Sequence, residues 1–220
     1  MNVQDAITQA FNLNHRLQHL LGSHEEENAV KKHGRRQVLS MLYWAIIVEH
    51  HQGILHLIES DYHASAFALL RSFEEAFLRS FVAMYGTDNQ VAALWDDKYN
   101  AEFEVVGEQM DKKLEYGPFF KDHLKMLHSF THGGRIQWIK FISVDSNHIG
   151  TAASKSLNDE ALALVMMTTL VLFLAALIMA DFWGYTSEHQ TVQAMHDEYV
   201  EEARDAFGLM LTPRTLRNSE

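Results

Sequence analysis

The feature that most constrains the fold is an uncharged apolar run, ALALVMMTTLVLFLAALIMA, from Ala161 to Ala180. A single helix of this length could cross a bilayer. Its flanking residues, Glu160 and Asp181, are acidic, and no Lys/Arg cluster marks a cytoplasmic end. A helix that is apolar on every side is also typical of the centre of a helical bundle. We therefore favour a buried core helix over a membrane span and expect no membrane insertion.

The rest of the chain also favours long helices. Only 2 of the 220 residues are proline and 11 are glycine, so few turns are enforced. Apolar residues recur at helical spacing over 3–21, 35–60 and 62–85, and Asn158 is expected to cap the apolar run. The sequence predicts an all-α fold: a single-domain helical bundle with long central antiparallel helices and a buried apolar helix near the C-terminus.

We expect one domain over residues 1–220, because the chain contains no repeat, low-complexity tract or linker. The charged stretch HEEENAVKKHG follows the first helix. It indicates that residues 1–34, a helix and a charged loop, are peripheral to the bundle. Residues 208–220 are expected to form a loose tail.

The charge and the cysteine content exclude several classes of function. A formal net charge of −11 is a poor match for non-specific nucleic-acid binding, which depends on neutralising phosphates. The compact basic cluster at Lys31, Lys32, His33, Arg35 and Arg36 is interpreted as a solvated helix start. The absence of cysteine excludes disulfides, thiolate zinc sites and cysteine catalysis. It fits a cytoplasmic location, as does an N-terminus without the pattern of a secretory signal.

A ladder of charges lies on the helix expected over residues 62–85. Arg71, Glu75 and Arg79 are four residues apart, so they share one face, and Glu74 lies beside them. One interpretation is a solvent-facing ladder that contributes little to stability. The other is a polar seam inside the bundle, where burying unpaired charges would be costly.

The preceding helix carries a second polar stripe, formed by Glu49, Gln52, His56 and Glu59. We expect the two stripes to face one another, and Glu49 and His56 to contact a ligand there. Three more histidines, His50, His51 and His63, are near in sequence.

A histidine stands directly before two glycines in LHSFTHGG. Gly133 can end a helix in the left-handed conformation, and Gly134 would let a ligand approach the backbone. His132 would then lie at the negative end of the helix dipole, which favours its protonated form. The bland interpretation is an ordinary helix C-cap. The functional one is a proton donor or phosphate contact, with Arg135 as a further ligand contact.

Metal and cofactor chemistry find little support in the sequence. The pairs His128/His132 and His15/His19 have the four-residue spacing that suits one metal, but there is no HExxH and no Glu-x-x-His repeat. A GxSxG nucleophile motif is also absent. We expect no metal site and no cofactor.

Two stretches carry a resemblance to known proteins: HHQGILHLIESDYHASAFALLRSFEEAFLR at residues 50–79 and LHSFTHGG at residues 127–134. The chain resembles uncharacterised bacterial all-helical proteins with an H…GI…L…SA.AL.R…E helix pair and a later S…HGG element. These are distantly similar to the HEPN superfamily of helical bundles. The resemblance spans about residues 35 to 180.

The resemblance implies a homodimer that acts as a metal-independent ribonuclease or toxin in a bacterial defence or toxin–antitoxin system. Its partners would be RNA or a cognate antitoxin protein. Catalytic HEPN proteins carry an arginine a few residues before the histidine on one helix, and no arginine precedes His132 in that way. By resemblance, Arg71 or Arg79 would stabilise the phosphate from another helix, Glu75 would orient the arginine and His132 would transfer a proton.

Two alternatives remain open at the level of the sequence. The first is a non-enzymatic helical bundle that acts as a dimeric interaction or regulatory protein. The second is a membrane-associated helical protein.

Overall fold

The computed structural model describes residues 2–22, 34–99, 103–114, 143–144, 149–150 and 155–207. Its helices are α1 (Val3–Gly22), α3 (Arg35–Glu59), α4 (His63–Tyr85), α5 (Asp88–Trp95), α6 (Phe103–Leu114), α9 (Lys155–Trp183) and α10 (Thr186–Phe207). Two short antiparallel strands, β1 (Ser143–Val144) and β2 (Ile149–Gly150), pair with each other. The expected all-α fold class is confirmed.

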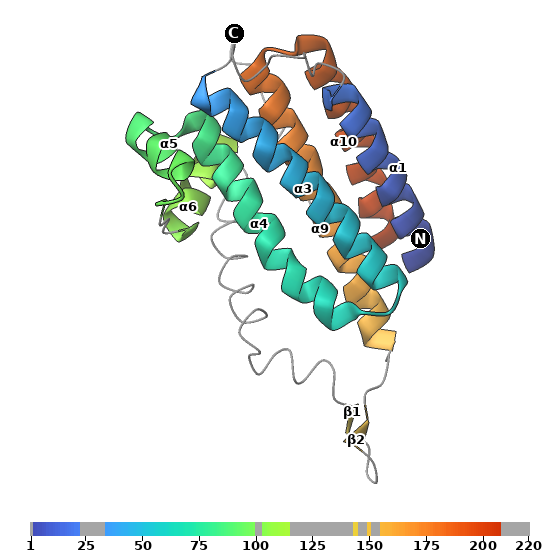
Figure 1. Ribbon diagram of the computed structural model, residues 1–220. Helices are drawn as coiled ribbons and strands as arrows, with labels where there is room; N and C mark the ends of the chain where they lie inside the picture. Colours follow the sequence, from blue (N-terminus) through green and yellow to red (C-terminus); the bar gives the residue numbers. More distant parts are fainter. Residues whose placement is uncertain are drawn as a thin grey trace.

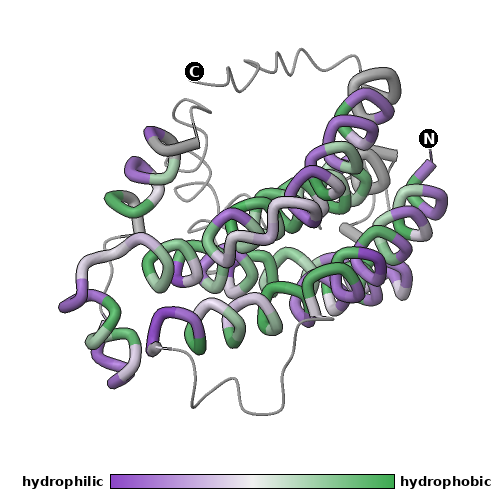
Figure 2. The backbone as a smooth tube through the Cα atoms, turned by 90° about the horizontal axis from the view of Figure 1, so that it is seen from above, coloured by the Kyte–Doolittle hydropathy of each residue, from purple (hydrophilic) through white to green (hydrophobic). Residues whose placement is uncertain are grey.

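The long helices form a bundle around α9 (Figure 1). Helices α3 and α4 make an antiparallel hairpin on one side of α9, and α1 and α10 lie on another (Figure 1). The short helices α5 and α6 cover the end of the hairpin where α4 finishes (Figure 1). Hydrophobic residues run through the middle of the molecule, and hydrophilic residues gather on the outer turns (Figure 2).

Helix α9 provides the centre of the core. Every residue from Val171 to Ala180 is buried, and α1, α3, α4 and α10 all pack against this helix. Within the described part of the chain, Glu160–Trp183 is the one segment long and apolar enough to cross a membrane, and most of it is covered by the other helices. A helix that is apolar all round needs neighbours on every side, and here the bundle supplies them.

The start of α9 differs from the prediction. The helix begins at Lys155, so Asn158 lies within its first turn and is not the N-cap. The first N–H groups of a helix have no intrahelical partner, so a polar residue is as well tolerated in the first turn as before it. Composition alone therefore misplaced this boundary by one turn.

Helix α1 is part of the core, contrary to the expectation that residues 1–34 are peripheral. One face of α1 is buried along its whole length, mainly against α9. The buried apolar residues of α1 are Ala6, Ile7, Ala10, Leu13, Leu17 and Leu21. The reason lies in α9, whose apolar surface extends beyond the area that α3 and α4 cover. The charged stretch after α1 and the tail at 208–220 lie outside the described residues.

Two tight turns join the long helices. Asp61, between α3 and α4, has φ 60°, and Gly184, between α9 and α10, has φ 72°. In both turns the next N–H bonds back to the last turn of the helix: Tyr62 to Leu57 at 2.7 Å, and Tyr185 to Ala180 at 2.9 Å. This pattern satisfies the last free carbonyls of a helix. The turns therefore hold neighbouring helices antiparallel.

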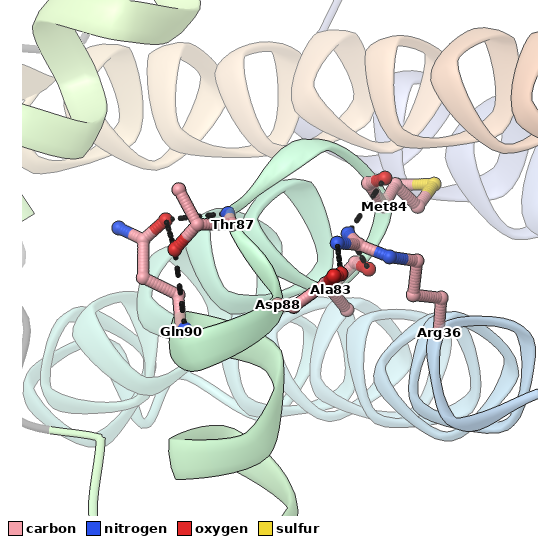
Figure 3. A network of polar contacts seen from close by, with 6 residues as sticks. All are labelled: Arg36, Ala83, Met84, Thr87, Asp88 and Gln90. Atoms are coloured by element: carbon pink, nitrogen blue, oxygen red, sulfur yellow. Dashed lines mark hydrogen bonds and ion pairs between the residues drawn. The ribbon is translucent and has the colours of Figure 1, made fainter.

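Arg36 ties three helix ends together (Figure 3). Its guanidinium contacts Asp88 Oδ1 at 2.6 Å, at the start of α5, and the carbonyls of Ala83 and Met84 at the end of α4. A cation is favoured at the negative end of a helix dipole. The side chain of its neighbour Arg35 lies over the Trp95 ring, 5.6 Å from its centroid. These two residues of the basic cluster thus make intramolecular contacts, while residues 31–33 lie outside the described residues.

Candidate functional site

Arg71 and Glu75 form a close ion pair on α4. Arg71 Nε donates to Glu75 Oε1 at 2.6 Å, as the spacing of the ladder predicted. The exposed fractions of the two side chains are 26% and 27%, so the pair is neither free in solvent nor sealed in the core. A charge-assisted hydrogen bond at this distance restricts the orientation of the guanidinium. The pair therefore presents an oriented cation at a partly dry surface.

Arg79 lies one turn further along α4, near Tyr99. Burial raises the pKa of the Tyr99 hydroxyl, and a hydrogen bond with Gln90 and the charge of Arg79 offset part of that rise. The described ion-pair partner of Glu75 is Arg71. Arg79 thus lies close enough to the segment that follows α5 for its charge to act on Tyr99.

Glu74 is buried beside the ion pair, with 4% of its surface exposed. Burial raises the pKa of its carboxyl group to about 8, because the charged form loses its hydration. At neutral pH Glu74 is therefore mostly protonated, and it can donate a proton within the bundle. The sequence placed this residue next to the ladder without distinguishing its environment from that of Glu75.

The polar stripe of α3 faces α1, so the expectation that it faces the α4 ladder is wrong. Gln52 Nε2 donates to Asn14 Oδ1 at 3.0 Å, and Gln4 Nε2 donates to Glu59 Oε1 at 3.3 Å. The ring of His56 packs on Phe11, with the centroids 4.6 Å apart. Helical spacing defines which residues share a face, but not which neighbouring helix covers that face.

The remaining residues of the expected site divide into two groups. Glu49 is exposed on α3, and His56 is exposed with Glu59 as its described ion-pair partner at 3.5 Å. His132, Gly133, Gly134 and Arg135 lie outside the described residues. The convergence of His132 with Arg71 and Glu75 therefore stays a prediction.

A buried polar network, which the sequence pattern did not reveal, crosses the centre of the bundle. Asn14 Nδ2 donates to His51 Nδ1 at 2.9 Å, and His51 Nε2 lies 3.2 Å from Thr169 Oγ1. Thr169 in turn donates to the Val165 carbonyl at 2.7 Å. These contacts join α1, α3 and α9, and Asn14, His51 and Thr169 are fully buried.

The direction of these hydrogen bonds fixes the state of His51. Its Nδ1 accepts from an amide, so the ring proton resides on Nε2 and is donated to Thr169. A second ring proton would point at the Asn14 amide group, which is itself a donor. Burial lowers the pKa of His51 to about 3, in agreement with a permanently neutral ring. His51 therefore serves as a structural connector.

Metal ligation has no support among the residues that the structure describes, where no group of three His, Asp or Glu side chains could hold an ion. His15 and His19 are both exposed on α1. His128 lies outside the described residues, so its pairing with His132 is not described.

A model of a protein family of unknown function, DUF6988, matches residues 44–205 of the sequence. The chain belongs to this family. The DUF6988 match contains the Arg71–Glu75 pair, the core helix α9 and nearly all of α10, whereas α1 precedes it. No curated protein and no solved structure matches the chain.

Proposed function

We propose that this protein is an HEPN-like helical bundle that cleaves RNA without a metal ion. The observation that carries the proposal is the Arg71–Glu75 pair, joined at 2.6 Å in a partly buried position. A partly exposed ion pair contributes little to stability, so the Coulomb attraction between these two side chains is a weak reason for their presence. An oriented guanidinium at a partly dry surface is suited to binding a phosphate.

The chemistry follows from the groups available. The 2′-oxygen of a ribose attacks the adjacent phosphorus, and the bond from phosphorus to the 5′-oxygen of the next nucleotide breaks. His132 exchanges protons with the attacking and leaving oxygens. Arg71, oriented by Glu75, stabilises the charge that develops on the phosphate, with Arg79 as the second cation. Gly133 ends the helix, Gly134 lets the ligand approach the backbone closely, and Arg135 is a further ligand contact. The products are a 2′,3′-cyclic phosphate and a free 5′-hydroxyl.

The test is incubation of the purified full chain with total RNA in EDTA. Cleavage with cyclic-phosphate ends is expected for the wild type. His132→Ala and Arg71→Ala should each reduce the rate by at least about a hundredfold, the scale of a lost acid–base group or charge stabiliser. Arg71→Lys should retain part of the activity.

Two controls make the result specific. His15→Ala removes an exposed histidine of α1, and Lys98→Ala removes an exposed cation near α5. Both variants should cleave as the wild type does. Intact RNA with the wild type, or equal loss in the controls, would refute the proposed activity.

A second candidate function is that of a non-enzymatic homodimer that regulates a partner protein. It is favoured by the outer face of α3, where the side chains of Leu42 and Ile46 lie one turn apart with 55% and 37% of their surfaces exposed. In this proposal the protein is cytoplasmic, and the coverage of most of α9 by the bundle supports a core helix over a membrane span. Sedimentation of the wild type and of Leu42→Glu separates the two functions: a dimer that dissociates in the variant, with RNA left intact, supports the second.

A further inference from the structure

Glu74 is a buried carboxyl that the proposed reaction does not use. It follows Arg71 by three residues on α4, a spacing that places two side chains next to each other on a helix. Arg71 nevertheless directs its Nε to Glu75. Among the described residues no hydrogen bond or ion pair reaches the Glu74 carboxyl. Glu74 thus lies beside an oriented cation without being paired with it.

The Glu74 carboxyl is enclosed but not sealed. Its residue is 4% exposed. The described side-chain atoms that have neither a partner nor accessible surface belong to His63, Glu160, Gln193 and Tyr199, and neither oxygen of Glu74 is among them. Because these two oxygens also have no partner, each of them keeps some contact with solvent. A molecule at the surface can therefore reach this carboxyl.

The position of Glu74 on α4 gives no structural reason for a carboxyl group. Leu70 and Leu78, one turn before and one turn after it, are 2% and 1% exposed. An apolar side chain between them would continue this face of α4, whereas a buried carboxyl without a partner lowers stability. A group that is costly to the fold and open to solvent is a candidate for chemistry.

Burial keeps this carboxyl protonated at neutral pH. It raises the pKa of Glu74 to about 8, because the carboxylate form would lose its hydration. Of the helices that pack against α4, α9 carries no charge from Ala161 to Ala180, the polar stripe of α3 faces α1, and α5 lies at the far end of α4 (Figure 1). On α6, Glu108 and Lys112 are the charged residues whose side chains are described, and their charges are opposite. The carboxyl therefore holds a proton that is available near neutral pH, as a general acid requires.

We propose that Glu74 is the general acid that protonates the leaving oxygen when RNA is cleaved beside the Arg71–Glu75 pair. This inference rests on the proposed ribonuclease function and assigns a further catalytic residue to it. As the bond from phosphorus to the 5′-oxygen breaks, the carboxyl O–H gives its proton to that oxygen, and a 5′-hydroxyl leaves. Glu74 becomes a carboxylate and regains a proton from water. The proposed role of His132 is then limited to the attacking oxygen, whose proton it accepts and releases to solvent.

The experiment compares two RNA oligonucleotides of the same sequence, one with a sulfur atom in place of the 5′-oxygen at the cleaved bond. An alkoxide must be protonated as it leaves, whereas a thiolate is a much weaker base and leaves without a proton. Glu74→Gln should slow cleavage of the oxygen substrate at least about a hundredfold and of the sulfur substrate less than about threefold. With the wild type and the oxygen substrate, the rate should fall as the pH rises through about 8, because the acid is then deprotonated. Glu74→Gln should lack this fall.

Glu198→Gln is the matched control, because it makes the same change at an exposed carboxylate of α10. It should cleave both substrates as the wild type does, and thermal melts should show that both variants are folded. With an active wild type, equal slowing of the two substrates by Glu74→Gln, or no slowing of either, would overturn the role of Glu74 and leave the ribonuclease function in place. A wild type that cleaves neither substrate would refute that function, and the role of Glu74 with it.

Discussion

Thr168 and Thr169 are neighbours on α9, both fully buried, yet they have different roles. The bonds described for Thr168 go to the Leu164 and Val165 carbonyls of its own helix, whereas Thr169 also accepts from His51. Valine has nearly the shape of threonine but no hydroxyl. Thr169→Val should lower the free energy of unfolding by about 1–3 kcal/mol, because it leaves a buried ring N–H without an acceptor.

Thr168→Val is the control for this prediction. It removes an equally buried hydroxyl from the same turn, and it should change the free energy of unfolding by less than about 1 kcal/mol. Urea denaturation of both variants measures the difference. Equal losses would show that the contact between His51 and Thr169 contributes nothing.

The sequence contains a signal for this network, but not for its connections. Asn14 falls on the apolar face of α1, between Ala10 and Leu17, and two threonines interrupt the apolar run of α9. Polar residues at such positions are buried and therefore need partners. Which partner each one meets depends on how far neighbouring helices are shifted along one another, and helical spacing carries no information on that shift.

The helix ends offer a prediction at the scale of the element. Asp61 adopts φ 60° between α3 and α4, whereas Ser60 before it has φ −94°. The left-handed conformation is costly for residues with a Cβ and not for glycine. Asp61→Gly should therefore raise the free energy of unfolding by about 0.5–1 kcal/mol. Ser60→Gly should lower it, since it only adds freedom to the unfolded chain.

Thermal unfolding of the two variants checks the signs. A loss of stability in Asp61→Gly would mean that the contact of Asp61 with His63, at 3.5 Å, outweighs the backbone strain.

The elements themselves were largely predictable. The α3–α4 hairpin follows from two helical patterns joined by a short polar break. Thr87 caps the start of α5 and forms a capping box with Gln90, as expected for a threonine directly before a helix. The pattern failed where two choices were locally equivalent. Asn158 could stand before or inside a helix, and the stripe beginning at Glu49 could face either neighbour of α3.

At the scale of the molecule, a single apolar segment predicts the architecture. An apolar helix without charges must be surrounded, so the run from Ala161 to Ala180 predicted a central helix within a bundle. That reasoning also implied a cover for every side of α9. The charged stretch after residue 22 led to the wrong prediction that α1 is peripheral, whereas α1 covers part of α9. The charge of residues 23–33 carries no information on the packing of the helix that precedes them.

Two buried titratable groups give the whole bundle a stability profile with two limbs. His51 has its pKa lowered from 6.5 to about 3, so between these values the unfolded chain binds a proton that the folded chain does not. Stability from this group is complete above pH 6.5 and is lost as the pH falls toward 3. Glu74 has its pKa raised from 4.5 to about 8, so the folded chain holds the extra proton. Stability from that group is complete below pH 4.5 and is lost as the pH rises toward 8.

Between pH 4.5 and 6.5 the two slopes are opposite and cancel, because each corresponds to one proton and about 1.4 kcal/mol per pH unit. The bundle should therefore be most stable on a plateau at mildly acidic pH, and it should lose stability from pH 6.5 to 8. Glu74→Gln keeps the shape of the protonated side chain and removes its titration. In this variant the loss above pH 6.5 should disappear, and stability should rise with pH between 4.5 and 6.5 because only His51 then titrates. Chemical denaturation from pH 4 to 8.5 measures both profiles, and an unchanged alkaline limb in Glu74→Gln would show that another group causes the loss.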